Sequence, residues 1–141
     1  MDTLTKERRS WTMSLVKSKN TKPEILVRSF LHRYGFRFRL HRNDLPGHPD
    51  IVLPKYQTVI EVRGCFWHQH PGCKAARIPK SHEAFWRDKF ARNVKRDKRT
   101  EKLLKKLGWH LIVIWECELK KNGFLETIPD KIRDRKSSRR R

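Results

Sequence analysis

The chain has 141 residues, enough for one domain with its own hydrophobic core and too few for two. Its 35 Lys and Arg against 15 Asp and Glu leave a formal charge of +20, which destabilises a compact chain by self-repulsion unless a polyanion such as nucleic acid binds. A membrane-spanning segment needs an apolar run of about 18 residues; the sequence has no such run and no signal-peptide pattern, so we expect a soluble, intracellular protein.

The first predicted helix begins at the sequence TKPE, residues 21–24. Thr21 suits the N-cap, Pro23 suits the first turn, and Glu24 is placed to close a capping box. We expect the helix to run to about Tyr34, because Gly35 is a typical stop. Its apolar face consists of Ile25, Leu26, Phe30 and Leu31.

Three short segments with strand patterns follow this helix. FRFRL at residues 36–40 alternates in polarity, and DLPGHP then breaks the chain before DIVL, residues 50–53. The segment TVIEV comes after the four-residue connection PKYQ. DIVL and TVIEV are therefore predicted to form a hairpin closed by Leu53 and Thr58.

This hairpin register places two carboxylates opposite each other, those of Asp50 and Glu61. Like charges on facing positions repel, so the arrangement favours a divalent cation such as Mg²⁺ between them. Arg63 projects from the same face as Glu61 and could neutralise charge on a phosphate. The simpler alternative is that Asp50 only follows a turn, while Glu61 and Arg63 form a solvated ion pair.

The segment GCFWHQHPGC, residues 64–73, contains two of the three cysteines. An odd number of cysteines in an intracellular protein argues against disulfides. The spacing C-x4-H-x2-C suits a loop wrapped around zinc, with a fourth ligand just after a later strand, so we predict a closed structural site. Its ligands would be Cys65, His70, Cys73 and Cys117. The alternative is three unrelated free thiols.

Three further residues of this segment are candidates for function. His68 falls outside the zinc set, near the carboxylates, and histidine is a common general acid or base, although a lone histidine is often an ordinary surface residue. Phe66 and Trp67 could be core residues. On a polar, glycine-bounded loop they are better suited to wedge between base pairs.

The rest of the chain predicts one long helix, one buried strand and a tail. The helix runs from an N-cap at Ser81 to Leu107, where Gly108 ends it, and is followed by the apolar strand WHLIVIWEC. The C-terminal residues 129–141 are strongly basic, and we expect a disordered tail. The order of elements indicates an α/β or α+β class with a mixed central sheet.

Five segments together resemble the very short patch repair (Vsr) DNA mismatch endonucleases: LPGHPDIV, GCFWHQHPGC, FW..K...N..RD.R, LGW and VIWEC. The resemblance covers roughly residues 7–120. It implies a restriction-endonuclease-like (PD-(D/E)xK) fold, a mixed sheet flanked by helices. It also implies Mg²⁺-dependent nicking of DNA, 5′ to the thymine of a T:G mismatch left by deamination of 5-methylcytosine.

The resemblance also implies roles for individual residues. Asp50 would hold Mg²⁺ together with the carbonyl of Val62, His68 would be the general base, and Glu24 would support water and metal. The implied zinc ligands are the four already inferred from spacing. The implied intercalating residues are Phe66, Trp67 and Met13.

One strand departs from the family pattern. Where familiar members carry a second catalytic histidine, this chain has Arg63, and Glu61 stands two residues before it. An arginine stays charged up to a pKa above about 12, so it cannot shuttle protons. We therefore expect Arg63 to stabilise phosphate charge and Glu61 to be a further metal ligand.

The resemblance implies a division of the chain and a cellular setting. Residues 1–20 would be a DNA-contacting arm, residues 21–128 the endonuclease domain and residues 129–141 the tail. We expect a monomeric, cytoplasmic bacterial enzyme at the nucleoid, acting on T:G-mismatched double-stranded DNA with other mismatch-repair proteins as partners. Two alternatives remain: a nuclease of the same fold that cuts matched DNA, and a zinc-stabilised DNA-binding module without catalysis.

Overall fold

The computed structural model describes residues 21–139, with side chains described up to residue 134. Met13 and the expected arm at residues 1–20 lie outside the described residues. Along the chain, the helices are α2 (Lys22–Arg33), α3 (Glu83–Lys106) and α4 (Ile128–Arg139). The strands are β1 (Arg39–Leu40), β2 (Ile51–Leu53), β3 (Thr58–Arg63) and β4 (His110–Trp115). Among the described helices, none combines the length and apolar character that crossing a lipid bilayer requires.

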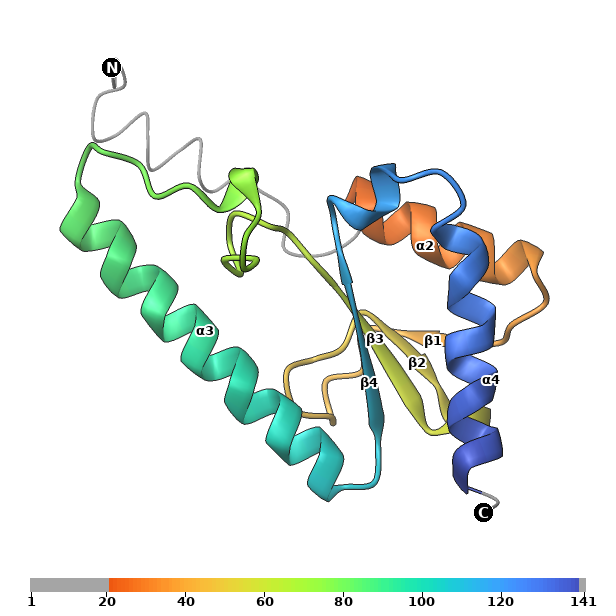
Figure 1. The fold of residues 1–141 in the computed structure, drawn as a ribbon. Helices are drawn as coiled ribbons and strands as arrows, with labels where there is room; N and C mark the ends of the chain where they lie inside the picture. The colour runs from red at the N-terminus through yellow and green to blue at the C-terminus, as the bar shows by residue number, and fades with distance from the viewer. Residues whose placement is uncertain (1–20, 140–141) are drawn as a thin grey trace.

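The four strands form one mixed sheet in the order β1-β2-β3-β4. β1, β2 and β3 pair antiparallel, whereas β3 and β4 pair parallel and are joined through α3. The helices lie on both sides of the sheet, with α3 on one side and α2 and α4 on the other (Figure 1). The predicted mixed α/β sheet with flanking helices is confirmed.

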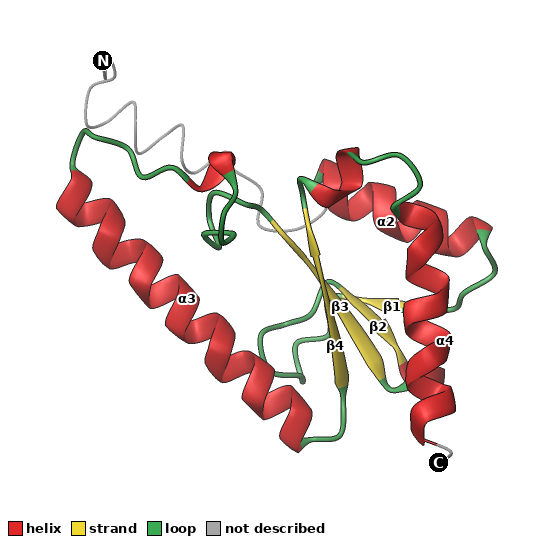
Figure 2. Cartoon of the chain, in the orientation of Figure 1, coloured by secondary structure: helices red, strands yellow, loops and turns green. Residues whose placement is uncertain are grey.

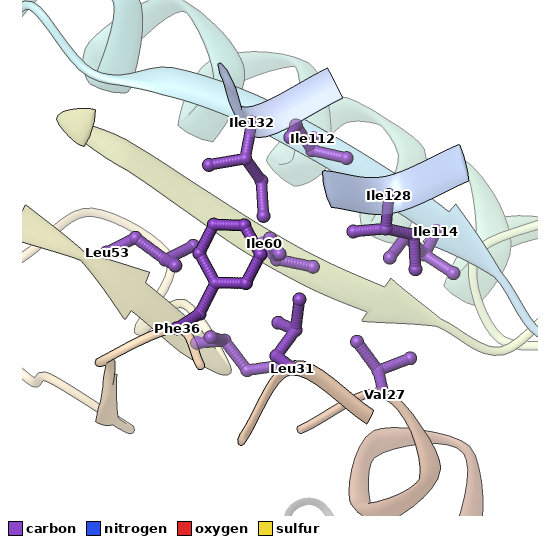
Figure 3. Packing of buried hydrophobic residues seen from close by; sticks show 10 residues of the cluster. Val27, Leu31, Phe36, Leu53, Ile60, Ile112, Ile114, Ile128 and Ile132 are labelled. Carbon is purple, nitrogen blue, oxygen red and sulfur yellow. The ribbon is translucent and has the colours of Figure 1, made fainter. Parts of the chain in front are cut away.

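Alternation along the strands sends apolar side chains to both faces. Ile60 packs with α2 and α4 in the larger core cluster, whereas its neighbour Val59 packs against Leu104 of α3 in a smaller one. Figure 3 shows the larger cluster, in which α2, α4 and the strands contribute fully buried aliphatic residues. Since Glu61 lies two residues after Val59, the charged end of β3 faces α3.

The helix α2 has the predicted bounds, but its predicted apolar face is wrong in part, because Ile25 and Leu26 are 40% and 41% exposed whereas Val27 and Leu31 are buried. Thr21 caps it by accepting a hydrogen bond from the Glu24 N–H at 3.5 Å, and Gly35 follows the helix with a φ of 93°. The long helix α3 is also present, but its N-cap is His82, with a φ of 56° and no capping side chain, so the prediction of Ser81 was wrong. The strand expected at residues 36–40 is reduced to Arg39–Leu40.

The helix α4 occupies most of the segment for which a disordered tail was expected, and the expectation is wrong for its described part. Ile128 and Ile132 lie four residues apart, so one face of the helix carries both into the core, where they are fully buried. Lys131 and Arg133, on either side of Ile132, are exposed on the remaining surface of the helix, which is why charge alone was misleading.

The connection from β3 to α3, residues 64–82, is almost entirely irregular and contains one short 3₁₀ turn at Lys74–Ala76 (Figure 2). It holds the segment GCFWHQHPGC. Because β3 and β4 are parallel neighbours, their C-terminal ends lie side by side. The connection after β3 and Cys117 after β4 therefore begin at the same end of the sheet.

Candidate active site and metal centre

A pocket of about 640 Å³ lies between the sheet and α3. Five of the predicted site residues line it: Asp50, Glu61, Val62, Arg63 and His68. The helix α3 contributes Arg96, Asp97 and Thr100 to its wall, and the loop before β2 contributes Gly47 and His48. Segments far apart in the sequence therefore meet in one polar pocket.

Asp50 sits at the entry to β2 and is held by the neighbouring strand. Its Oδ2 accepts a hydrogen bond from the Val62 N–H at 2.8 Å. The ligand atoms of Asp50, Glu24 and His41 all lie within 4.8 Å of one another. The structure thus brings Asp50 and Glu24 together, and the three side chains could hold a divalent cation.

His41 was missed by the sequence analysis. Its backbone N–H donates to the Asp50 carbonyl at 3.3 Å, which continues the pairing of Leu40 with Ile51 by one residue. Its side chain then reaches Glu24, with Nε2 at 2.8 Å from Oε1. Extending the expected strand at residues 36–40 by one residue would have placed His41 opposite Asp50.

Burial dominates the titration of Asp50. It raises the pKa of the carboxyl from 3.8 to about 7, helped by the charges of Glu24 and Glu61 and opposed by the Val62 N–H and by His68. A carboxyl of this kind keeps its proton to near neutral pH unless a cation replaces that proton.

This raised pKa predicts how the protein without Mg²⁺ responds to pH. The folded state holds the Asp50 proton to about pH 7 and the unfolded state releases it near 3.8, so the stabilisation is complete below pH 4 and is lost between pH 4 and 7. Asp50→Asn should therefore raise the free energy of unfolding at pH 8, by at most about 4 kcal/mol, and change it little at pH 4. Urea denaturation at both pH values measures the difference, and equal effects at both would contradict the prediction.

The other predicted carboxylate, Glu61, is bound to Arg63 across the same face of β3. Its Oε2 accepts from Nε at 3.1 Å and from Nη2 at 2.8 Å, and the Nη1 of Arg63 donates to Glu101 of α3 at 3.0 Å. Burial raises the pKa of Glu61 although Arg63 opposes the shift. The hairpin register that places Glu61 beyond the pair Ile51 and Ile60 is confirmed.

This pairing changes the reading of Arg63. Its side chain is only 6% exposed and its charge is balanced by Glu61 and Glu101, so it ties β3 to α3. A contact with phosphate, as expected from the sequence, would require Arg63 to leave these partners. Glu24 and His41 have ligand atoms close enough to share a cation with Asp50. Glu61 instead accepts hydrogen bonds from Arg63.

Gly47, in the loop LPGHP, lies where no side chain fits. Its φ is 74°, and a Cβ atom would overlap Thr100 Cγ2 and stand 3.1 Å from Glu61 Oε1. The loop can approach α3 and Glu61 this closely only with glycine at this position, which keeps Asp50 at the pocket wall.

His68 is oriented by a residue that sequence analysis did not select. Its Nδ1 lies 2.8 Å from Asp97 Oδ2 of α3, which fixes the ring and leaves Nε2 as the atom available to accept a proton. One helical turn earlier, Asn93 donates to the Trp67 carbonyl at 3.0 Å. The four-residue spacing of Asn93 and Asp97 places both on one helix face, but it does not identify their partners in the distant loop.

The four predicted zinc ligands come together in a second cluster. Ligand atoms of Cys65, His70, Cys73 and Cys117 lie within 4.8 Å of one another, and all three cysteines are free of disulfides. The Nδ1 of His70 is 3.7 Å from the sulfur of Cys65 and 3.4 Å from that of Cys117. Three sulfurs and one imidazole are a donor set that fits tetrahedral zinc. The His70 ring stacks on Trp115 with centroids 4.2 Å apart.

Phe66 and Trp67 form an aromatic cluster with the start of α3. Their ring centroids are 5.0 Å apart, Phe66 lies 5.0 Å from Phe90, and Trp67 lies 6.0 Å from Trp86. Both remain half-buried rather than fully covered. Lys89 places its ammonium 5.8 Å from the Trp67 ring. The cluster thus combines partly exposed rings with a basic helix.

Comparison with known proteins gives a consistent set of relatives. A family model described as DNA mismatch endonuclease Vsr matches residues 1–74. Over 125 residues the chain is 52% identical to the type II nicking enzyme V.XorIIP of Xanthomonas oryzae pv. oryzae, covering 89% of this chain and 91% of that protein. Identity to the type II nicking enzyme V.NmeAIP of Neisseria meningitidis is 49% over 119 residues, 84% of each chain. The DNA mismatch endonuclease Vsr of Escherichia coli is 38% identical over 115 residues, 82% of this chain and 73% of that protein.

Proposed function

The chain belongs to the Vsr family of DNA endonucleases, and we propose that it nicks one DNA strand 5′ to the thymine of a T:G mismatch arising from 5-methylcytosine deamination. The observation that carries this proposal is the pocket lined by His41 and Asp50, which form a triad with the buried Glu24, and by the pair of His68 and Asp97. A cation site next to an oriented histidine is what hydrolysis of a phosphodiester needs. The mixed sheet is compatible with the restriction-endonuclease-like fold that the family resemblance implies.

The residues divide the work as follows. Asp50 and Glu24 would hold Mg²⁺, and the ion would supply positive charge that polarises the phosphate and makes a water molecule more acidic. The carbonyl of Val62 remains a predicted further ligand. His68 accepts the proton of the attacking water at Nε2, and Asp97 stabilises the imidazolium that forms. Glu61 and Arg63 keep β3 and α3 at a fixed spacing around these groups.

The cysteine cluster serves the same site indirectly. Zinc bound by Cys65, His70, Cys73 and Cys117 would fix the loop that carries His68, Phe66 and Trp67. All four positions are taken by protein atoms, so this ion has no open position for substrate and is structural.

The aromatic pair is the proposed reader of the mismatch. A wedge that opens the base stack meets least resistance where pairing is already weak. Trp67→Ala should therefore lower the preference for T:G over C:G duplexes by about tenfold, since stacking on an aromatic side chain contributes about 1–3 kcal/mol per base. Nicking rates on the two duplexes measure the ratio. Tyr34→Ala removes a half-exposed ring at the C-cap of α2 and should leave the ratio unchanged; an unchanged ratio in Trp67→Ala would refute the wedge.

One alternative remains, a nuclease of the same fold that cuts matched DNA. Two relatives are named type II nicking enzymes, which keeps this candidate open. The non-catalytic DNA-binding module is set aside, because the relatives are endonucleases. The deciding experiment is a Mg²⁺-dependent nicking assay on T:G duplexes with varied flanking bases, with matched duplexes as controls. Cleavage confined to T:G substrates supports the proposal, and equal cleavage of matched DNA supports the alternative.

The cellular setting stays a prediction. Double-stranded DNA is the substrate class that the family implies. A monomeric state, a place at the bacterial nucleoid and the recruitment of other mismatch-repair proteins are expectations from the family resemblance.

A further inference from the structure

His41 is the one member of the triad that the proposed Mg²⁺ site leaves without a role. We propose that His41 Nε2 is the third protein ligand of the cation held by Glu24 and Asp50, and that it makes the site prefer Mn²⁺ and the later first-row ions to Mg²⁺. This inference rests on the proposed function, because it concerns the cation of the same site.

The backbone places His41 beside Asp50 in an unusual conformation. The N–H of His41 donates to the Asp50 carbonyl at 3.3 Å, so the two residues are paired across β1 and β2 at the end of the ladder. The φ of His41 is 52°, in the left-handed region, which for a residue other than glycine is unfavourable by about 1 kcal/mol or more. Such a conformation in a residue that lines the pocket is a reason to look for a role of its side chain.

The side-chain contacts supply that role. His41 Nε2 is 2.8 Å from Glu24 Oε1, and one ligand atom from each of Glu24, His41 and Asp50 fits within 4.8 Å. Ligand atoms around one octahedral ion at about 2.1 Å are roughly 3 to 4 Å apart, so small side-chain rotations suffice for all three to bind it. The Val62 N–H occupies Asp50 Oδ2, which leaves Oδ1 for the ion.

A simpler role for His41 is an ion pair with Glu24. The helix already provides a cation for that carboxylate, since Arg28 Nη1 lies 3.7 Å from the same Oε1 one turn along α2. His41 would stabilise the buried Glu24 carboxylate in either role, as an ion-pair partner or as a fellow metal ligand. Only in the second role does its imidazole nitrogen bond to the cation, so the experiment must detect this nitrogen.

The chemical consequence is a change in metal preference. Mg²⁺ prefers oxygen ligands and dehydrates reluctantly, whereas an imidazole nitrogen suits the first-row transition ions. Two carboxylates and one imidazole are therefore a less favourable set for Mg²⁺ than the all-oxygen set expected from Asp50, Glu61 and Val62.

The test uses Mn²⁺ as a paramagnetic probe in the full-length protein, with zinc added first to fill the cysteine cluster. Electron spin echo modulation of bound Mn²⁺ should show the nitrogen signal of a coordinated imidazole. His41→Gln, which keeps a polar side chain beside Glu24, should abolish that signal while Mn²⁺ remains bound. His48→Gln and His68→Gln, at two other histidines of the same pocket, should retain it.

Calorimetric titration gives an independent readout. The ratio of Mn²⁺ affinity to Mg²⁺ affinity should fall by about tenfold or more in His41→Gln, mostly through weaker Mn²⁺ binding. Two results would overturn the assignment of His41 alone. One is a nitrogen signal that persists in His41→Gln. The other is the absence of a nitrogen signal in the unsubstituted protein, provided that Asp50→Asn abolishes Mn²⁺ binding and so locates the ion at this site. Mn²⁺ binding that Asp50→Asn leaves unchanged overturns the cation site of the proposed function, and the role of His41 with it.

Discussion

Asp50→Asn is expected to lower Mg²⁺-dependent nicking of a T:G duplex by about a thousandfold or more, equivalent to about 4 kcal/mol of transition-state stabilisation. The amide keeps an oxygen that accepts the Val62 N–H, so the local fold survives. It removes the negative charge on which cation binding depends. Single-turnover nicking measures the rate, and a gel-shift titration should give a DNA affinity within about threefold of the unsubstituted protein, because the phosphate contacts of the basic surface are unchanged.

Asp44→Asn is the matched control for this variant. Asp44 lies in the same connection before β2, but its side chain is 62% exposed and pairs with Arg42 rather than with the pocket. The same chemical change there should leave nicking unaltered. Full activity of Asp50→Asn would refute the assignment of Asp50, and equal loss in both variants would point to an effect of overall charge.

The second large effect is expected from loss of one zinc ligand. Cys73→Ser should reduce bound zinc from one equivalent to almost none and lower the free energy of unfolding by several kcal/mol, since binding energy at a structural zinc site is folding energy. The substitution leaves the buried Cys65, whose pKa is raised by burial to about 11, without the ion that would stabilise its thiolate. Metal analysis and thermal unfolding measure the two quantities.

His68→Gln separates ligand loss from disturbance of the loop. His68 lies between Cys65 and His70 in the same segment, yet its ring points to Asp97 rather than to the cysteine cluster. It should therefore keep its zinc while losing nicking activity. One equivalent of zinc and an unchanged melting temperature in Cys73→Ser would exclude the predicted site.

Local patterns predicted what depends on local geometry. The four-residue connection between Leu53 and Thr58 determines the hairpin register, and from it the common face of Glu61 and Arg63. The spacing of Cys65, His70 and Cys73 was enough to expect a shared site, because a short loop limits how far apart its side chains can lie.

What the sequence could not predict depends on contacts between distant segments. Asp97 meets His68 across 29 residues, and Arg63 reaches Glu101 across 38, so neither pairing leaves a local pattern. The strongly basic composition of the C-terminal residues led to the wrong expectation of a disordered tail. Ile128 and Ile132 are buried only because α2 and the sheet pack against them. Tertiary packing determines these two pairings and the helix α4, and it cannot be predicted from local patterns in a single sequence.

The face of α3 toward the sheet has a further consequence. Asn93 holds the carbonyl of Trp67, Asp97 holds the ring of His68, and Glu101 holds Arg63, at intervals of four residues along one rigid rod. If the aromatic loop reads the mismatch as proposed, a force that DNA exerts on this loop would be transmitted through α3 to His68 and to the end of β3. An insertion of one residue between Asn93 and Asp97, which turns the following residues by about 100°, should then separate recognition from cleavage without replacing a residue of either.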